Sequence, residues 1–391
     1  MFNTCTIKDL LNSGEAELRT GPFGFLFHAS EASCTGVPMI HIRNIGMGNI
    51  REEKLEFVPK EVAQRLPEQL LQPGDIVFGR KSAVDRHALV TPKHTNWMQG
   101  SDCIRLRLKS PSIHPKFLSY CFLTNRHRQW MINQCSHGEK MSSLNHAIIG
   151  RIPLSLPPVH VQQEIVDILS DYDELIENNL KQLNLLEEIL RSIYHEWFIR
   201  SCSSDWAVQK LEEIADINKA SLNKQNAPEI IHYVDISSVS TGKIDRIEFI
   251  PFSNASSRAR RIARCGDIIW STVRPSRRVY SIVEERELIV STGFAVITPK
   301  TVSYTYLYCA LSTDEFVEHL IRSATGSAYP AVSIDCFKNA LIPIPPVALL
   351  EKFHAIAEDI FKQKNCIVKK NHNLAKSRDL LMHRLLATSK Q

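Results

Sequence analysis

The stretch PPVHVQQEIVDILSDYDELIENNLKQLNLLEEILRSIYHEWFIR, residues 157–200, contains no glycine, and no proline after its opening pair. A run of this length is unusual for a globular helix. Alternating steps of four and three residues mark a heptad seam: Ile165, Leu169, Tyr172, Ile176, Asn179, Leu183, Leu186, Leu190, Ile193 and Trp197. Asn179 alone interrupts its apolar character, as a buried Asn does where it sets the register of a coiled coil. Such a helix needs a partner helix.

The carboxyl-terminal stretch of the same chain is the predicted partner. IPPVALLEKFHAIAEDIFKQKNCIVKKNHNLAKSRDLLMHRLL, residues 344–386, opens with the same double proline, 188 positions after Pro157. It contains its own apolar series with a spacing of seven residues. The expected interface of the two helices is Ile165, Leu169, Tyr172, Leu186, Ile193, Phe353, Ile360, Ile367, Leu374 and Leu381.

Charge also favours this pairing. Residues 159–200 hold nine acidic and three basic residues, whereas residues 347–390 hold four acidic and nine basic ones. The net charges are −6 and +5, so each helix attracts the other and repels a copy of itself. An antiparallel pair would be roughly 60 Å long at 1.5 Å per residue. The alternative is two unrelated amphipathic helices that pack on separate cores.

The chain upstream of each long helix is a repeated module. Gly74-Asp75 recurs as Gly266-Asp267, and further pairs of glycines recur at offsets between 188 and 194 residues. A period near half the chain length indicates a duplication rather than a solenoid. The predicted order is a module over residues 1–157, a helix over 158–200, a second module over 201–345 and a helix over 346–391.

The modules are expected to be mixed. Short apolar or alternating runs predict strands at residues 40–45, 75–78, 88–90, 103–108, 233–236, 267–270, 279–283 and 294–297. Helices are predicted at residues 115–124, 128–133, 304–311 and 314–322. The predicted fold class is α+β, with two mixed α/β modules joined by two long antiparallel helices and related by a pseudo-twofold internal repeat.

Composition limits the possible functions. The 391 residues carry a net charge of +5, and the ten cysteines form no CxxC pair, which is typical of a reduced, cytoplasmic protein without a zinc site. No phosphate-binding loop and no complete dinucleotide fingerprint is present. Asp171, Asp173, Glu174 and Glu177 are interpreted as a solvated helix face. The sequence therefore predicts a non-catalytic protein.

Cations after the Gly-Asp-Ile of each module are the best candidates for contact with a polyanion. Guanidinium groups suit phosphate contacts and bidentate reading of guanine. The candidates for DNA binding are Arg80, Lys81 and Arg86 in the first module and Arg274, Arg277 and Arg278 in the second. Another cationic run, residues 258–264, is open to two interpretations, a solvated turn or a further DNA contact.

Two Gly/Ser loops, residues 136–144 and 324–333, form a second candidate surface. Glycine lets the backbone approach a ligand closely, and Lys, Ser and Tyr side chains can contact phosphates or base edges. The candidates here are Lys140, Ser142, Ser327 and Tyr329. A purely structural turn is the alternative. A third and weaker set is Arg43, Asn44, Ser237 and Ser238.

The whole chain resembles a specificity (S) subunit of a type I restriction-modification system, the HsdS family. The resemblance depends on the order of modules and helices, on IPLSLPP at 152–158 and IPIPP at 342–346, and on the QQEIVDIL that starts the first helix. It implies two target-recognition domains, each of which reads one half of a bipartite asymmetric site in double-stranded DNA. It also implies that the helix pair measures the unread gap between the half-sites. A rigid antiparallel helix pair that carries two modules would itself place the half-sites about one helical turn apart.

The resemblance further implies partners and cofactors. Family members bind two modification (methyltransferase) subunits, and two restriction subunits complete the full complex. S-adenosylmethionine, ATP and Mg are expected on those partner subunits and none in this chain. Two other hypotheses stay open from the sequence: a nuclease or methyltransferase with an unrecognised motif, and a coiled-coil scaffold whose two modules bind proteins rather than DNA.

Overall fold

The computed structural model describes residues 3–22, 33, 35–135, 143–223, 225, 227–284 and 287–387. Its two long helices are α6 (Val159–Tyr194), which a π-helical turn continues over His195–Arg200, and α11 (Val347–Ala387). The chain divides into two compact units, Met1–Glu177 with His372–Gln391, and Asn178–Asn371. Each unit therefore contains a part of both long helices.

The first unit combines three sheets with short helices. Their strand orders are β2-β9-β6-β7-β4, β5-β3-β8 and β1-β10, and all neighbours are antiparallel except the parallel pairs β4-β7 and β3-β8. The strands are β1 (Asn3–Thr6), β2 (Ala16–Thr20), β3 (Val37–Ile40), β4 (Met47–Gly48), β5 (Glu56–Val58), β6 (Ile76–Gly79), β7 (His87–Leu89), β8 (Met98–Gln99), β9 (Cys103–Leu108) and β10 (Pro153–Leu156). The helices are α1 (Ile7–Asn12), α2 (Lys60–Arg65), α3 (Pro115–Leu123), α4 (Asn125–Cys135) and α5 (His146–Gly150).

The core of the first unit lies between its main sheet and the helices. The continuous apolar run of β6 is buried on both faces, as expected for a central strand. Phe117 of α3 packs in the same cluster as Ile165 and Leu169 of α6 and Met382 of α11. The beginning of α6 and the end of α11 are thus part of the core of this unit.

The second unit repeats this plan. Its sheets have the orders β12-β21-β18-β19, β16-β13-β20-β17, β11-β22 and β14-β15. The strands are β11 (Ala207–Lys210), β12 (Ala215–Ile217), β13 (Ile230–Val234), β14 (Val239–Ser240), β15 (Lys243–Ile244), β16 (Glu248–Pro251), β17 (Ala259–Arg264), β18 (Ile268–Ser271), β19 (Tyr280–Ile282), β20 (Glu287–Ser291), β21 (Phe294–Pro299) and β22 (Leu341–Ile344). The helices are α7 (Leu211–Ile214), α8 (Tyr304–Ala310), α9 (Asp314–Arg322) and α10 (Ile334–Lys338).

Corresponding elements show that the repeat is structural. In each unit the first strand pairs antiparallel with the last, as β1 with β10 and β11 with β22. Each unit also has one equivalent parallel pair, β3-β8 and β13-β20. Side chains 188 positions apart cap the last short helices, because Asn145 accepts from the start of α5 and Ser333 from the start of α10. The predicted α+β class with a duplicated module is confirmed.

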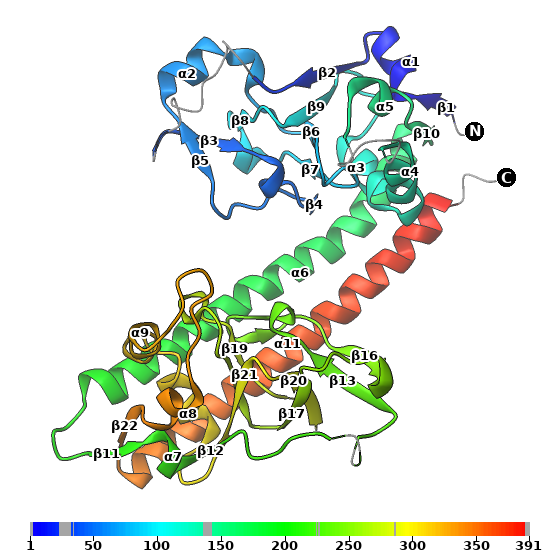
Figure 1. Ribbon diagram of the computed structural model, residues 1–391. Coiled ribbons are helices and arrows are strands. Elements are labelled where there is room, and N and C mark those ends of the chain that lie inside the picture. The colour runs from blue at the N-terminus through cyan, green and yellow to red at the C-terminus, as the bar shows by residue number, and fades with distance from the viewer. Residues whose placement is uncertain are drawn as a thin grey trace. The chain divides into compact units, whose positions relative to one another are not determined.

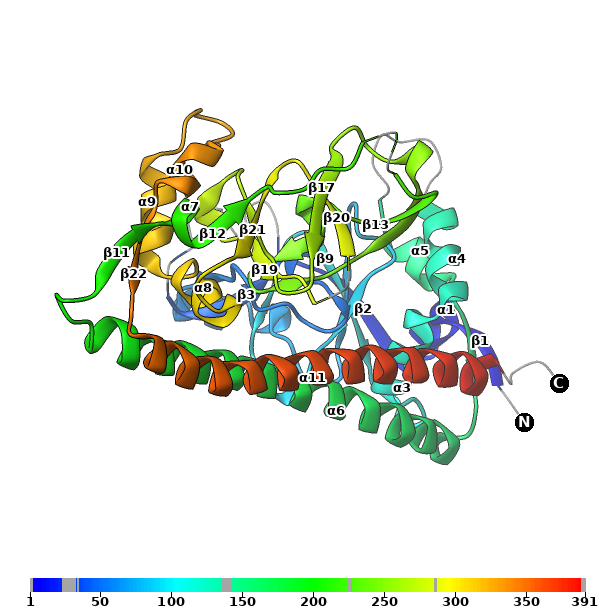
Figure 2. The same cartoon turned by 90° about the horizontal axis from the view of Figure 1, so that it is seen from below.

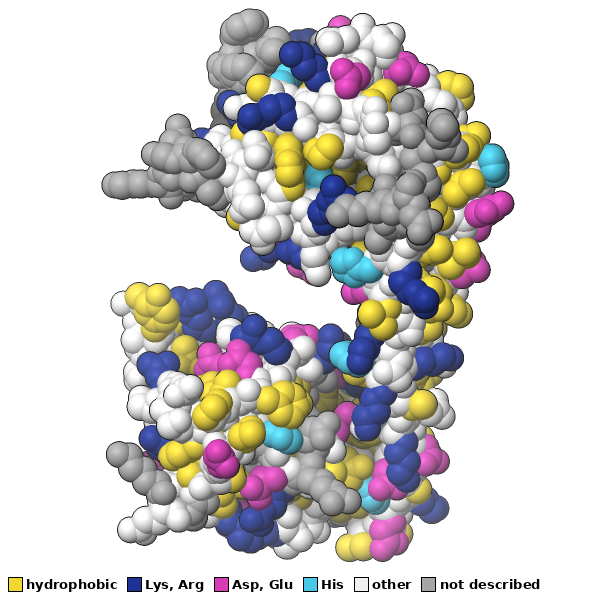
Figure 3. Space-filling model, turned by 90° about the vertical axis from the view of Figure 1, so that its right-hand side faces the viewer, with side chains coloured by type: hydrophobic (Ala, Val, Ile, Leu, Met, Phe, Trp, Pro, Cys, Tyr) yellow, Lys and Arg dark blue, Asp and Glu magenta, His cyan; other side chains and the backbone are white. Residues whose placement is uncertain are grey.

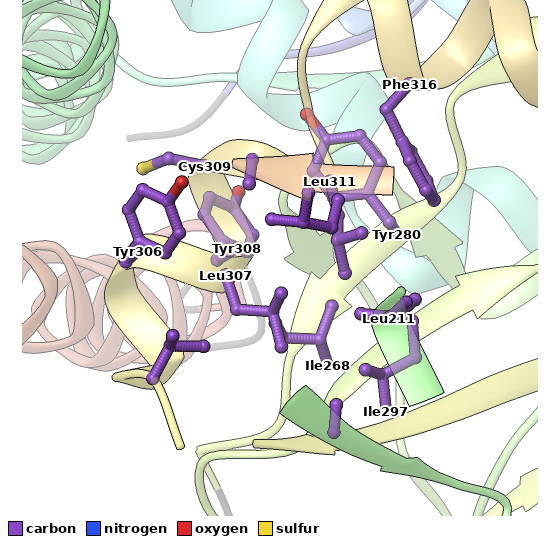
Figure 4. Packing of buried hydrophobic residues seen from close by; sticks show 14 of the residues in the cluster. Leu211, Ile268, Tyr280, Ile297, Tyr306, Leu307, Tyr308, Cys309, Leu311 and Phe316 are labelled. Carbon is purple, nitrogen blue, oxygen red and sulfur yellow. The ribbon is translucent and has the colours of Figure 1, made fainter. Parts of the chain in front are cut away.

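The second unit has an aromatic core. Leu307 of α8 lies beside Ile268 of β18, with Tyr306, Tyr308 and Phe316 in the same cluster (Figure 4). The cluster extends to α6 through Leu190 and Tyr194, to its π-helical continuation through Phe198, and to α11 through Phe353, Ala357, Ile360 and Phe361. In Figure 2, α8 lies between the strands of this unit and α11.

The long helices run antiparallel within each unit (Figure 1). In the first unit Asp173 of α6 accepts from Arg378 of α11 at 2.7 Å, and in the second Glu187 of α6 pairs with Lys364 of α11. Residue numbers that rise along α6 are therefore matched by numbers that fall along α11. The predicted pairing of two long antiparallel helices is confirmed.

Some predicted boundaries were wrong. Residues 40–45 and 233–236 were expected to be strands, but the strands end at Ile40 and Val234, and 3₁₀ turns follow over Ile42–Asn44 and Ile236–Ser238. The side chain of Asn44 explains the first turn, because it donates to the carbonyls of Arg51 and Glu53 and accepts from the His41 amide. Local side-chain to backbone hydrogen bonds of this kind compete with a strand ladder.

Candidate nucleic-acid interface

The candidate cations of the second unit lie on a strained loop after β18. Its 3₁₀ turn, Pro275–Arg277, is flanked by Arg274 with φ 51° and Arg278 with φ 52°. Residues other than glycine adopt this left-handed backbone rarely, and keep it only where surrounding structure holds them. Such strain concentrates at ligand-binding loops.

The Gly/Ser loop of this unit holds Arg274. The Arg274 amide donates to the carbonyl of Pro330 at 2.7 Å, and its guanidinium carbon lies 4.3 Å from the centre of the Tyr329 ring. Thr325 and Ala331 exchange two backbone hydrogen bonds that close the loop. The Tyr329 side chain is 70% exposed, and Ser327 beside it is exposed too. The structure therefore brings two predicted sets together, Arg274 with Ser327 and Tyr329.

The other two arginines of the loop differ in their contacts. Arg278 forms an ion pair with Asp314 at the start of α9, and this guanidinium lowers the pKa of the Asp314 carboxyl. The carbonyl of Arg278 also accepts from the Thr241 hydroxyl at 2.8 Å. The Arg277 side chain is exposed, and within the described part of the chain no carboxylate pairs with it.

The first unit has the same loop with its cations displaced along the chain. The Leu144 amide donates to the carbonyl of Arg80 at 2.8 Å, as that of Val332 donates to Thr272. Lys81 and Ser143 form the bridge that Val273 and Ala331 form in the second unit. The counterpart of Arg274 is therefore Ser82, which has a φ of 62°. Both units therefore carry cations on the equivalent loop, but at different positions within it.

The other predicted residues of the first unit are Arg86, Lys140 and Ser142. Arg86 is half-buried just before β7, and its amide donates to the Ala83 carbonyl at 3.1 Å in a turn. Lys140 and Ser142 lie outside the described residues.

The third set of candidates is largely structural. Asn44 is fully buried and Ser238 is 4% exposed. Arg43 binds Glu56 at 2.6 Å and the carbonyl of Lys54. Ser237 is exposed, and its hydroxyl donates to Asp235 at 3.3 Å. Two of these four side chains are therefore inaccessible to DNA.

Residues 258–264 do not form a solvated turn, so that interpretation was wrong. Ala259–Arg264 form β17, which pairs with β20 and contains a bulge between Ala259 and Arg261, and only Arg258 lies in the turn before it. Ala259 and Ala263 face the core, and burial lowers the pKa of the Arg261 guanidinium. The sequence lacks a clear alternation here, because the bulge breaks the period of two and arginines occupy three of the six strand positions.

Basic side chains are spread over the visible face of each unit, with Asp and Glu between them (Figure 3). Among the described residues no group of three His, Cys, Asp or Glu side chains could hold a metal ion. No helix in the described ranges is long and apolar enough to span a membrane.

The predicted helix-pair residues of α6 and α11 are all buried or half-buried. Ile165, Leu169, Phe353, Ile360 and Ile367 are at most 8% exposed. The other five are half-buried: Tyr172, Leu186, Ile193, Leu374 and Leu381. Asn179 of the seam donates to the side-chain oxygen of Asn371 at 2.6 Å.

Asp173 was wrongly interpreted as part of a solvated face. One carboxylate oxygen accepts from Arg378 and the other from the Tyr120 hydroxyl at 2.6 Å, which connects α3 to both long helices. Burial and this hydrogen bond raise the pKa of Tyr120. The opposite net charges of the two helices predicted ion pairs between them. They did not identify this pair, because Asp173 and Arg378 are 205 residues apart in the sequence.

Comparison with known proteins identifies the class to which this duplicated fold and its cationic loops belong. The family model described as type I restriction modification DNA specificity domain matches residues 25–188 and again residues 203–374. The chain belongs to this family and contains its domain twice.

Particular relatives agree with the assignment. The specificity subunit of the type I restriction enzyme MjaIX of Methanocaldococcus jannaschii is 23% identical over 379 residues, which cover 88% of this chain and 81% of that protein. The MjaVIII specificity subunit of the same organism is 23% identical over 295 residues, 68% of this chain and 69% of the relative. The crystal structure of the S subunit from M. genitalium matches with a TM-score of 0.58 at 16% identity, over 99% of this chain and 96% of that one. At this identity the likeness shows the fold.

Proposed function

We propose that this chain is the DNA-recognition and assembly subunit of a type I restriction-modification complex. It is a specificity subunit and not an enzyme, because family membership and named relatives agree on this role. Each recognition module reads one half of a bipartite asymmetric site, and the helix pair sets the gap between the halves. Its place of action is the cytoplasm, where that DNA lies.

One observation supports the DNA-reading role most directly. In both units the strand that begins at the isoleucine of Gly-Asp-Ile leads into a loop with a residue of positive φ, and the Gly/Ser segment pairs with that loop through equivalent hydrogen bonds. Arg80 and Lys81 lie on one loop, and Arg274, Arg277 and Arg278 lie on the other. A fixed backbone that presents guanidinium groups suits both phosphate contact and base reading.

Exposed apolar side chains of α6 support an assembly role. Ile168 and Leu175, in the part of α6 that belongs to the first unit, and Leu185 and Ile189, in the part that belongs to the second, are between 44% and 57% exposed. An exposed apolar stripe on a surface helix marks a protein-binding site. Two modification subunits cover it in the proposed complex, and two restriction subunits complete the assembly. S-adenosylmethionine, ATP and Mg bind to those partners.

Methylation mapping tests the proposal. The chain is expressed with its modification partner in a host without adenine methylation, and the modified adenines are located by single-molecule sequencing. We expect one motif with two short half-sites and a fixed gap. Methylation without a motif, at a level equal to that of the modification subunit alone, would refute the recognition role.

Salt dependence separates this function from a protein-binding scaffold. Contacts to phosphates release counterions, so DNA affinity falls by orders of magnitude between 50 and 200 mM salt when several phosphates are bound. A scaffold whose modules bind proteins through apolar contacts shows little change over the same range.

A further inference from the structure

The three arginines of the loop after β18 are not equivalent, and their contacts divide them into two roles. Arg274 and Arg278 both have left-handed backbones and bracket the turn Pro275–Arg277. Two such residues within five positions show that tertiary contacts determine the shape of this loop. The contacts of each arginine can therefore be compared on a fixed backbone.

Arg274 is engaged inside the protein. Its guanidinium stacks at 4.3 Å over the Tyr329 ring, and its amide is held by the Pro330 carbonyl. A cation over an aromatic face is stabilised by the ring quadrupole. One terminal nitrogen of the same guanidinium also donates to the Ala328 carbonyl at 3.5 Å, so both the face and one edge of this group are engaged within the protein.

Arg278 is engaged at the other end of the turn. Its guanidinium pairs with Asp314, and its carbonyl accepts from Thr241. Asp314 lies in the first turn of α9, where a carboxylate is favoured by the helix dipole. This contact ties the end of the turn to α9.

Arg277 lies between these two anchors with an exposed side chain. Its amide donates to the Arg274 carbonyl at 2.9 Å, and the buried Pro275 precedes it, so its backbone is fixed. No carboxylate pairs with its guanidinium in the ranges that the structure describes. The five donors of this side chain are presented outward from a rigid turn.

We propose that Arg277 reads a guanine in the half-site of the second module, through bidentate hydrogen bonds in the major groove, and that Arg274 and Arg278 are positioning residues. The proposal rests on the DNA-recognition function given above. It selects Arg277 because recognition of the O6 and N7 atoms of guanine needs a planar, uncommitted pair of donors on a fixed backbone.

A lysine at this position separates base reading from phosphate contact. Arg277→Lys keeps the charge but loses the planar fork, so a phosphate contact survives and bidentate reading does not. The control is Arg322→Lys, an exposed arginine of α9 that pairs with Glu318 at 2.7 Å in the same unit.

The experiment uses the whole complex with its modification subunits and maps the methylated motif of each variant. For Arg277→Lys we expect discrimination at one G·C pair to fall about tenfold to hundredfold in the half-site that the second module reads. The half-site that the first module reads should not change. Arg322→Lys should leave the whole motif unchanged. A fully preserved motif in Arg277→Lys would overturn the proposal. Loss of any motif in the wild-type complex would instead overturn the proposed function.

Tyr329 tests the positioning role. Tyr329→Ala should weaken discrimination at the same base pair as Arg277→Lys. The double variant should lose no more discrimination than Arg277→Lys alone. Tyr329→Phe keeps the ring under Arg274 and should restore the motif. Relaxation at a different base pair in Tyr329→Ala, or failure of the Phe variant to restore the motif, would show that Tyr329 itself contacts the DNA and would refute this role.

Discussion

Phe353 of α11 should be the most sensitive position of the helix pair in the second unit. Its side chain is fully buried, and its ring centre lies 5.0 Å from that of Phe198, 6.0 Å from Tyr194 and 6.3 Å from Trp197. These three rings belong to the end of α6 and its π-helical continuation. Phe353→Ala therefore removes the group that joins the start of α11 to the end of α6.

The expected cost follows from the burial. Truncation of a buried Phe to Ala destabilises a protein by about 3–5 kcal/mol, because apolar contact is lost and a cavity remains. The edge-to-face contacts with three rings place the cost in the upper part of that range. With a urea dependence of about 2 kcal/mol per molar, the unfolding midpoint should fall by about 2 M.

Urea titration of the full chain, followed by far-ultraviolet circular dichroism and tryptophan fluorescence, measures this shift. Ile356→Ala is the matched control, since Ile356 lies one turn further along α11 and is 41% exposed. Its midpoint should change by no more than about 0.5 M. Equal shifts for the two variants would refute the assignment of Phe353 to the helix-pair core.

Three further predictions concern assembly, the Gly/Ser loop of residues 324–333 and pH. Leu186→Glu combined with Leu374→Glu puts charges into the seam and should abolish co-purification of the modification subunit while the circular dichroism of the modules persists; a normal complex would contradict the pairing scheme. Gly326→Ala should lower DNA affinity about tenfold in gel shifts, because Gly326 has a φ of 96° and a Cβ there would lie 3.2 Å from the Tyr329 carbonyl oxygen. Gly266→Ala, with a φ of 88° but open space, is the control, and equal losses would exclude a specific effect on the loop. Burial lowers the pKa of His127 to about 4, so the unfolded chain binds more protons below pH 6.5 and stability falls as the pH drops from 6.5 to 4.5. His127→Phe should reduce that fall by up to about 1.4 kcal/mol per pH unit in urea titrations, and an unchanged slope would exclude His127 as a cause.

The sequence alone determined the duplicated α+β architecture and the two long helices. Heptad spacing, the double prolines and the opposite charges are local or periodic signals, which survive in a one-dimensional chain. The continuous apolar run of β6 and the helix of residues 314–322 were likewise recognisable, because their patterns match one secondary structure over their full length.

Only the tertiary structure decided which cations are presented and which are engaged. Arg274, Arg277 and Arg278 look alike in sequence, yet Tyr329 and Asp314 engage the first and the last from 55 and 36 positions away. Asp173 looked like its solvated neighbours until the fold placed Tyr120 and Arg378 against it. The physical reason is that the role of a side chain depends on the groups that it contacts in the folded protein. These groups are distant in the sequence, so no periodic pattern predicts the contacts.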